Sequence, residues 1–139
     1  MIVIESHKKK TENILKKYSG AILADVTSKA TDSLVKLSPF YPHGGIPIPF
    51  SEGMTATCVE AIWQGLKVFE NSDVDVSLFM NDTMKNIKRS VRKNGKPLGH
   101  RKGVNGNELL GYIEARKQIY IYRPIDGCWR IKFHPLLNE

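Results

Sequence analysis

The sequence predicts an α+β fold in a single compact domain, with a small, mostly antiparallel sheet and about four helices. Three features predict it: segments with helical spacing of apolar residues, short β-rich segments between them, and loops rich in glycine and proline. At 139 residues and 41% hydrophobic composition, the chain is long enough for one domain that buries roughly two thirds of its unfolded surface. We therefore expect one domain over residues 1–139.

The first forty residues predict a helix and several short strands. β-Branched residues predict a strand over residues 2–5 and another over residues 21–26. Between them, residues 11–18 have helical spacing, and Gly20 follows as a C-terminal stop signal. Residues 33–36 are interpreted as a further short strand.

Residues 37–67 are the most informative part of the sequence. Four of the seven prolines and three glycines fall between residues 37 and 53, which predicts a rigid loop at the rim of a pocket. Thr57 followed by Glu60 forms a capping-box pattern, which predicts the start of a helix. One side of that helix is predicted to face the core, and the other to carry a polar stripe. The core side holds Cys58, Val59, Ile62, Leu66 and Phe69, and the stripe holds Thr57, Glu60, Trp63, Gln64 and Lys67.

Two interpretations of that stripe remain open. It is either the solvated side of an ordinary amphipathic helix or one wall of a binding pocket. Spacing alone favours the first, and neighbouring segments favour the second.

The positive charge of the chain is concentrated after a short helix predicted over residues 73–79. Residues 85–103 contain eight cations and no acid, and a helix is predicted with Met84, Ile87 and Val91 as its buried stripe. The cations form either a solvated flank or an anion site. They are Lys85, Lys88, Arg89, Arg92, Lys93, Lys96, Arg101 and Lys102.

The loop over residues 94–106 favours the anion site. It holds four glycines with donors between them, and it turns at Asn94-Gly95. Glycines allow backbone amides to approach a ligand, and arginine forks match phosphate oxygens. Acids elsewhere interrupt the long basic surface that duplex nucleic acid prefers, so a small phosphorylated ligand fits better.

The last predicted helix covers residues 108–120 behind an Asn107 cap, and it places Arg116 on its apolar stripe. A buried guanidinium needs an acid, a set of carbonyls or a ligand anion, unless its stem lies on the core and its head reaches water. The segment over residues 119–131 is rich in β-formers and aromatics, and predicts an edge strand or a subunit contact.

Composition and motifs exclude several classes of protein. Cys58 and Cys128 form neither a disulfide framework nor a metal pattern, and we expect two buried thiols. The four histidines have no paired spacing, so we expect no metal, and no sequence motif predicts a cofactor. No apolar run reaches the roughly 20 residues of a membrane span, and we expect a cytoplasmic protein.

The sequence LSPFYP at residues 37–42, followed by Thr57 and by ExxxQxxK at residues 60–67, resembles the NADAR (YbiA-like) family. The resemblance implies an N-glycosidase that acts on ribose phosphates or ADP-ribosyl groups. The chain departs from the family pattern with Pro39 in place of asparagine and Ala61 in place of histidine. These departures argue for a nucleotide-ribose pocket that binds without cutting.

Nearly the whole chain is similar to the type-one anti-Thoeris proteins of phages, through SPFYPHG at 38–44, EAIWQGLKVF at 60–69, GHRKG at 99–103 and ARKQIY at 115–120. The resemblance implies a non-catalytic oligomer, a dimer or hexamer, that sequesters a cyclic ADP-ribose signal in the cytoplasm of the infected bacterium. Some members also bind cyclic di- or trinucleotides at separate sites.

This ligand chemistry agrees with the basic segment and gives a set of expected binding residues, with none expected to be catalytic. Arginines are expected to pair with pyrophosphate, an aromatic ring to stack on adenine, and amides to read its edge or the ribose hydroxyls. The expected residues are Trp63, Gln64, Lys67, Phe79, Asn86, Arg89, Arg92, His100, Arg101 and Arg116.

Two other functions remain open. One is an N-glycosidase in which Lys67 or Glu60 attacks or assists at the anomeric carbon. The other is a basic module that binds nucleic acid.

Overall fold

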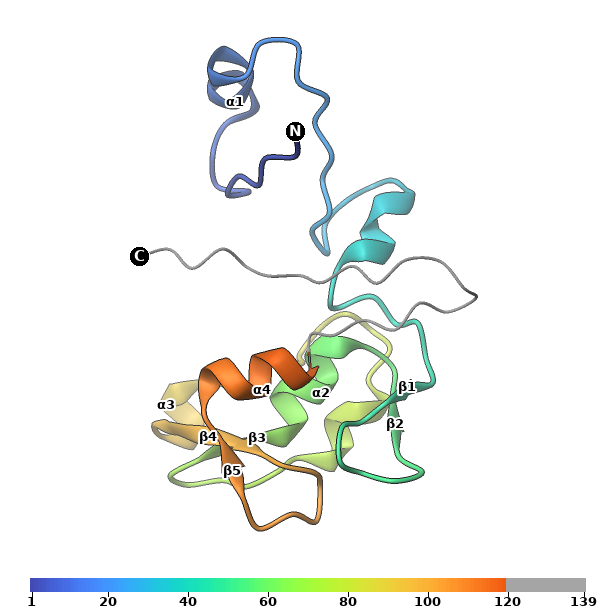
Figure 1. Cartoon of the computed structure of the whole chain (residues 1–139), viewed down its shortest axis with the longest axis vertical. Helices are drawn as coiled ribbons and strands as arrows, with labels where there is room; N and C mark the ends of the chain where they lie inside the picture. The colour runs from blue at the N-terminus through green and yellow to red at the C-terminus, as the bar shows by residue number, and fades with distance from the viewer. Residues whose placement is uncertain (120–139) are drawn as a thin grey trace. The chain divides into compact units, whose positions relative to one another are not determined.

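The structure, a computed structural model, describes residues 1–119. The contacts of the chain form two compact units, Met1–Pro39 and Phe40–Glu139, which are described in turn (Figure 1). Over the described residues there are four α-helices and two small antiparallel sheets, so the predicted α+β class is confirmed. The single domain stays a prediction. We predicted an edge strand or subunit contact over residues 119–131 and a buried thiol at Cys128. Cys128 and all but the first residue of that segment lie outside the described residues.

The first unit contains the predicted first helix, α1 (Thr11–Lys17), which is followed by Gly20 at a φ of +76°. The strands predicted over residues 2–5 and 21–26 are wrong, because these β-prone runs pair with no strand in the described chain and a lone strand is not stable. The strand predicted over 33–36 is also wrong. The Asp32 carboxylate accepts a hydrogen bond from the Leu34 amide at 2.9 Å and starts a 3-10 helix, η1 (Ser33–Leu37).

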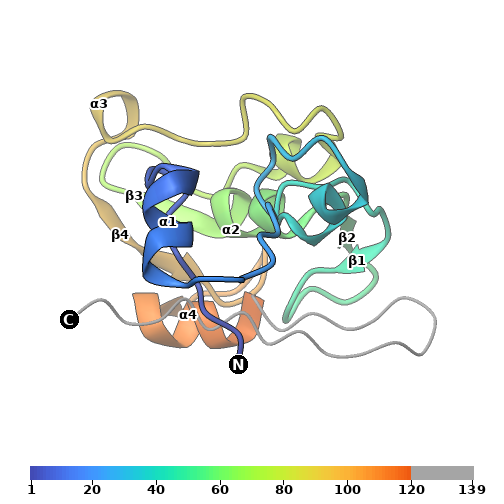
Figure 2. The same ribbon diagram turned by 90° about the horizontal axis from the view of Figure 1, so that it is seen from above.

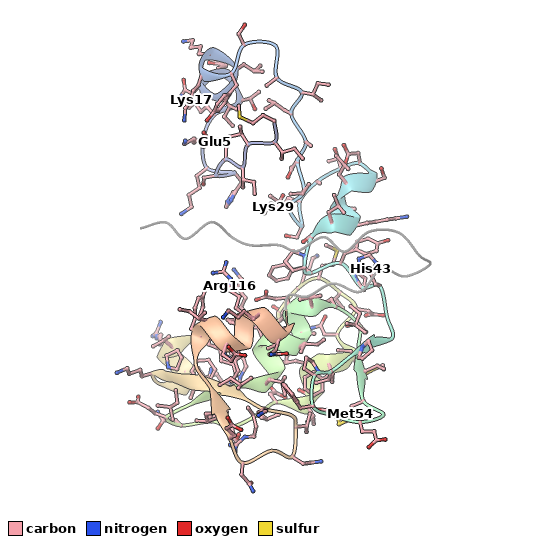
Figure 3. The ribbon with its side chains drawn as sticks, viewed as in Figure 1. Glu5, Lys17, Lys29, His43, Met54 and Arg116 are labelled. Carbon is pink, nitrogen blue, oxygen red and sulfur yellow. The ribbon has the colours of Figure 1, made fainter. Side chains whose placement is uncertain are left out.

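Glu5 ties the segment before α1 to the end of that helix (Figure 3). Its carboxylate accepts hydrogen bonds from Lys9, from Lys17 at 3.3 Å and from the Tyr18 hydroxyl at 3.2 Å. The hydrogen bond from Lys9 is the main cause that lowers the pKa of Glu5 to about 2. α1 itself buries no side chain, so these polar contacts hold the segment in place of a core.

The second unit alternates short strands and helices. In chain order its elements are β1 (Ile46–Pro47), β2 (Thr55–Ala56), α2 (Val59–Leu66), β3 (Lys67–Phe69), η2 (Val76–Met80), α3 (Val91–Asn94), β4 (Pro97–Arg101), β5 (Leu109–Leu110) and α4 (Tyr112–Ile119).

The larger sheet has the order β3-β4-β5, and all its strands are antiparallel. Its register places Lys67 opposite His100, and His100 opposite Leu110. Directly opposed residues project from the same face of a sheet, so these three side chains share one face. Arg101, the next residue along β4, projects from the other face.

The core of the second unit is built around α2, whose eight residues are all buried. α2 and α4 both contact β4 and also contact each other, and the two ribbons lie next to the sheet in both views (Figures 1 and 2). The apolar cluster combines side chains of α2 with side chains from segments before and after it in the sequence. It contains Ile48, Ala56, Val59, Ile62, Trp63, Leu66, Phe79, Leu110, Ala115 and Ile119.

The start of α2 differs from the capping box predicted by the sequence. Its N-cap is Cys58, whose sulfur accepts a hydrogen bond from the Ala61 amide at 3.4 Å. The Thr57 hydroxyl lies instead against the carbonyl oxygens of Phe79 and Asn81, because the Thr57 amide is already bonded to the Phe79 carbonyl at 2.8 Å. A tertiary contact thus moves the cap by one residue.

Two predicted helices take other forms. Residues 84–90 contain no helix, because Met84 and Asn86 have positive φ angles of 60° and 57°. Of the predicted buried stripe, Ile87 is buried as expected, Met84 is half-buried and Val91 is exposed. The helix predicted over 108–120 begins only at Tyr112, since Leu109 and Leu110 pair with β4. The short helix predicted over 73–79 is present as the 3-10 helix η2, capped by the Asp75 carboxylate.

Gly65 is the point of closest packing between α2 and η2. A Cβ atom there would lie 2.3 Å from the Phe79 ring and 3.1 Å from the Asp75 carbonyl oxygen. Gly65→Ala should therefore destabilise the protein by about 1–3 kcal/mol, although alanine normally favours a helix. Thermal unfolding measures the effect. Gly111→Ala is the control, because its Cβ would meet nothing within 4 Å; equal melting temperatures for the two variants would contradict the packing.

Within residues 1–119 no helix combines the length and the apolar character that crossing a bilayer requires.

Candidate functional site

His100 lies on β4 beneath α2, at the centre of a group of rings and cations. The Trp63 ring of α2 lies over the imidazole, with ring centroids 3.8 Å apart and planes at 38°. Lys67, opposite His100 in the sheet register, raises the positive potential around the imidazole. A helix side chain and two strand side chains thus converge at one place.

α4 adds two further groups to the same place. The Tyr112 ring meets the Trp63 ring edge-on, with centroids 5.5 Å apart and planes at 88°. One turn later, the Arg116 guanidinium lies 5.5 Å from the centre of the Tyr112 ring, an i, i+4 cation–π contact. We call these five residues, Trp63, Lys67, His100, Tyr112 and Arg116, the aromatic–cationic cluster.

The cluster is buried at its floor and open at its edge. Trp63 and His100 are 7% and 3% exposed, whereas Tyr112 is 60% exposed. Arg116 is half-buried on α4, where Figure 3 labels it. A ligand arriving from solvent would meet Tyr112, Lys67 and Arg116 first.

His100 is held neutral in this place. Burial is the main cause that lowers its pKa to about 4, and the charge of Lys67 adds to the effect. The backbone of Trp63 opposes the shift, as the smallest of the three causes. Among residues 1–119, no group forms a hydrogen bond with either ring nitrogen.

The predicted polar stripe of α2 is buried, which rules out the solvated interpretation of Glu60. Glu60 and Gln64 are each 6% exposed, and the Gln64 amide donates to the Glu60 carboxylate at 2.9 Å. The Gln64 side-chain oxygen accepts from the Arg89 backbone amide at 3.2 Å. Gln64 is therefore engaged inside the protein at both of its polar atoms.

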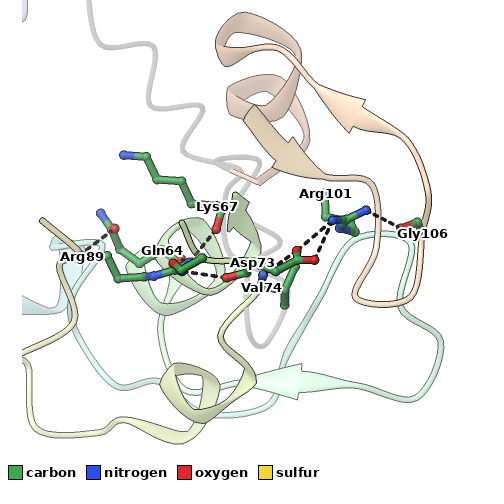
Figure 4. A network of polar contacts seen from close by, with 8 residues as sticks. Gln64, Lys67, Asp73, Val74, Arg89, Arg101 and Gly106 are labelled. Atoms are coloured by element: carbon green, nitrogen blue, oxygen red, sulfur yellow. Dashed lines mark hydrogen bonds and ion pairs between the residues drawn. The ribbon is translucent and has the colours of Figure 1, made fainter. Parts of the chain in front are cut away.

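Arg89 is a structural clamp (Figure 4). Its guanidinium donates to the backbone carbonyl oxygens of Gln64 at 3.1 Å, of Lys67, and of Asp73 at 2.6 Å, and also to the Ser72 hydroxyl. It also lies 4.8 Å from the centre of the Phe69 ring. Burial lowers the pKa of this guanidinium, and the charges of Asp75 and Asp73 oppose the shift. In this structure its donors face protein carbonyls, so the expected pairing with pyrophosphate finds no support at Arg89.

Arg101 projects to the other face of β4 and binds Asp73 (Figure 4). Its guanidinium reaches the two carboxylate oxygens at 2.8 and 2.9 Å and the Gly106 carbonyl oxygen at 3.2 Å. The Arg101 hydrogen bond, followed by that of the Val74 amide, lowers the pKa of Asp73. The pair lies at an open cleft of about 400 Å³ lined by Asp73, Val74, Val76, Arg101, Val104, Asn105 and Gly106. Residues 97–101 of the predicted glycine-rich loop form β4, and only its end, with Arg101, lines the cleft. Asp73 already neutralises this arginine.

Three other expected residues lie apart from the cluster. Phe79 is 3% exposed within the core, where it packs over Gly65, and presents almost no surface for stacking on adenine. Asn86 and Arg92 are exposed, in the loop before α3 and in α3 itself. The structure therefore brings together Trp63, Lys67, His100 and Arg116 from the expected set.

The eight cations of residues 85–103 divide into two groups. Arg89 and Arg101 are engaged as described, and Lys102 pairs with Glu108 at 3.0 Å. The other five form no ion pair with a described acid, and all five are exposed. They are Lys85, Lys88, Arg92, Lys93 and Lys96.

Sequence reasoning missed Tyr112 and Asp73. Tyr112 was not among the expected binding residues, and it lies at the exposed first position of α4. Asp73 was expected to begin the short helix over residues 73–79 and, with other acids, to interrupt the positive charge. An acid thirty residues or so from an arginine gives no signal in a single sequence that the two meet.

We next consider the predicted buried thiol of Cys58 and the grouping of residues that could bind a metal. Cys58 is fully buried, and burial raises the pKa of its thiol. Over residues 1–119, no three histidine, cysteine, aspartate or glutamate side chains gather closely enough to hold a metal ion.

The comparisons with known proteins give one match. A family model described as a family of unknown function (DUF6939) matches residues 6–125. No curated protein and no solved structure matches the chain. The resemblances to the anti-Thoeris and NADAR families stay predictions. Because the match covers most of the sequence, the chain belongs to the DUF6939 family.

Proposed function

We propose that the protein binds an anionic, adenine-bearing signal of the cyclic ADP-ribose type and holds it intact, and so blocks the bacterial Thoeris defence. The observation that carries the proposal is the aromatic–cationic cluster. Residues from positions 63, 67, 100, 112 and 116, on two helices and two strands, meet at one place. A ring-bearing anion requires both kinds of group that this cluster supplies.

Each half of the cluster fits one half of such a ligand. The exposed Tyr112 ring offers a face or edge for stacking on a base, with Trp63 and His100 behind it. Lys67 and Arg116 supply positive charge for a pyrophosphate, and an arginine fork matches phosphate oxygens in pairs.

The internal contacts of Arg89 and Arg101 sharpen the proposal. Phosphate pairing falls on Lys67 and Arg116, while Arg89 and Arg101 hold the segments around them. The five cations of residues 85–96 that pair with no acid in residues 1–119 raise the potential of the second unit and speed the approach of an anion.

Calorimetry with ADP-ribose and with cyclic ADP-ribose isomers tests the proposal. Binding is expected, and Arg116→Ala should weaken it by about 30-fold and Lys67→Ala by about tenfold, the equivalent of about 2 and 1.4 kcal/mol. Lys117→Ala is the matched control, since Lys117 is adjacent to Arg116 but exposed beside Glu114. Equal losses in all three variants would reflect only net charge, and no binding by the wild type would overturn the proposal.

The second candidate function is an N-glycosidase. The observation that favours it is the buried carboxylate of Glu60 in the first turn of α2, the helix that ends just before Lys67. Incubation with the same ligands, followed by denaturation of the protein and analysis of what is released, separates the two. Intact ligand supports sequestration. Free base or ribose phosphate, lost in Glu60→Gln, would support the enzyme.

We also propose an oligomeric state, further ligands and a cellular location for the protein. We expect a homo-oligomer, a dimer or hexamer, in the cytoplasm of the infected bacterial host, with cyclic di- or trinucleotides as further ligands. Light scattering of the purified protein with and without ligand measures the assembly.

A further inference from the structure

His100 combines nearly complete burial with two unsatisfied polar atoms. The residue is 3% exposed, and neither Nδ1 nor Nε2 forms a hydrogen bond with any group in residues 1–119. Almost all buried polar groups in native proteins are hydrogen-bonded, so a buried imidazole without partners is a costly exception. A leucine or phenylalanine would fill the same space beneath Trp63 without that cost.

The environment of the ring limits what its partner can be. Lys67 lies opposite His100 in the sheet, and burial keeps the ring uncharged at neutral pH. A neutral imidazole offers one N–H donor and one lone-pair acceptor. Phosphate groups are served by Lys67 and Arg116 at the edge, so the group that suits His100 is a neutral one that donates or accepts hydrogen bonds in a plane.

We propose that His100 is the residue that recognises the base of the bound ligand, forming a hydrogen bond with the edge of a nucleobase that enters beside Trp63. The inference rests on the proposed function and adds to it the group that selects a base-bearing ligand over a bare sugar phosphate. The Trp63 ring lies 3.8 Å from the imidazole and would border the base on one side, while the exposed Tyr112 ring supplies the stacking surface.

Entry of a base requires one side chain to move. The imidazole nitrogens expose no surface in this structure, and Trp63 covers them from the side of α2. Tyr112 is the exposed member of the cluster, held to Trp63 by a ring-edge contact and to Arg116 by a cation–π contact. Both contacts are weak enough for Tyr112 to turn aside and expose the part of the Trp63 ring that it touches, beside which His100 lies.

Replacing His100 should change stability and ligand binding in opposite directions. His100→Phe keeps a ring beneath Trp63 and removes both unsatisfied nitrogens, so it should raise the melting temperature by a few degrees. The same variant should weaken the binding of ADP-ribose by about 30-fold, while the binding of ribose 5-phosphate, which has no base, stays within about twofold. His100→Gln, which keeps one donor and one acceptor, should recover part of the ADP-ribose affinity.

Calorimetry with the two probes, together with thermal unfolding, measures these effects. If wild type binds ADP-ribose but His100→Phe binds it equally well, the inference is overturned and the proposed function stands. If wild type binds neither ADP-ribose nor cyclic ADP-ribose, the proposed function fails and the inference fails with it.

NMR of the wild-type protein keeps the test decisive if His100→Phe does not fold. The ring nitrogen signals of His100 should show no hydrogen bond in the free protein, and one of them should shift on addition of ADP-ribose but not of ribose 5-phosphate. Signals that already show both nitrogens hydrogen-bonded in the free protein would overturn the inference, because another partner would then satisfy the ring.

Discussion

Arg89→Ala is expected to lower the free energy of unfolding by about 3 kcal/mol. The Arg89 guanidinium donates to carbonyl oxygens of Gln64, Lys67 and Asp73. The first two belong to the end of α2 and the start of β3, where a helix leaves carbonyls without intrahelical partners. Alanine would remove the Arg89 hydrogen bonds to Lys67 and Asp73 and one of the two bonds to the Gln64 carbonyl oxygen, which also accepts from the Lys67 amide. It would also remove the stacking on Phe69.

Arg89→Lys should recover little of this stability. An ammonium is a compact charge on a flexible stem, whereas the planar guanidinium presents donors in several directions at once. Four acceptors from three separate segments surround the Arg89 head group, and one ammonium cannot meet their geometry.

Arg92→Ala is the matched control for these variants. Arg92 is three residues away, carries the same charge and is exposed in α3 without an ion pair to a described acid. Its replacement should change stability by less than about 0.5 kcal/mol. Denaturant unfolding followed by circular dichroism measures all three variants, and equal stabilities of Arg89→Ala and Arg92→Ala would show that Arg89 is not a clamp.

Arg89 also shows what could and could not be predicted from the sequence. Helical spacing and cap signals identified α1 and the start of α2 to within two residues, because these signals are local. The end of α2 was placed too late, since Lys67–Phe69 form β3 instead of a last turn of the helix. The eight cations of residues 85–103 were equally visible, but their division into internal clamps and exposed charges depends on contacts between residues 16 to 28 positions apart. A charge pattern in one sequence does not contain that information.

The errors in the elements have the same origin. Leu109 and Leu110 have the spacing of a helix, yet they pair with β4 because Arg101 and His100 are available as partners. Ile2, Val3 and Ile4 are strong β-formers, yet no described strand pairs with them. Local propensity is overridden in both cases by the presence or absence of a partner strand.

The candidate site was predicted in part. Trp63, Lys67, His100 and Arg116 were expected to bind ligand, and the fold brings them into one cluster through the β3-β4 register and the packing of α4. The expectation that Phe79 stacks on a ligand finds no support, since its spacing is compatible with core and with site, and only packing over Gly65 places it in the core.

The second large effect expected is a loss of stability in mild acid. The ordinary pKa of histidine is 6.5, and that of His100 in the folded protein is about 4. Between these two values the unfolded chain binds a proton that the folded protein does not, so unfolding becomes easier as the pH falls. The stability contributed by neutral His100 is fully present above pH 6.5 and is lost as the pH falls towards 4. A difference of about 2.5 pKa units corresponds to about 3 kcal/mol.

The other groups with a shifted pKa affect stability at other pH values, so the effect of His100 can be measured separately. The lowered pKa values of Glu5 and Asp73 also remove stability in acid, but only as the pH falls below the ordinary values of 4.5 and 3.8. The pKa of Cys58 is raised from 9.0, which affects alkaline conditions. Among the described groups with a shifted pKa, only His100 therefore acts between pH 6.5 and 4.5.

Urea unfolding at pH 7.0, 5.5 and 4.5 tests the prediction, with His100→Phe as the control. The wild type should lose about 2–3 kcal/mol across this range, and the variant should lose much less, because phenylalanine binds no proton. Parallel pH dependence in the two proteins would show that the acid sensitivity belongs to other groups. A steeper loss in the wild type alone would mean that the cluster is built around an uncharged ring, which binding of a base requires and binding of a phosphate by His100 does not.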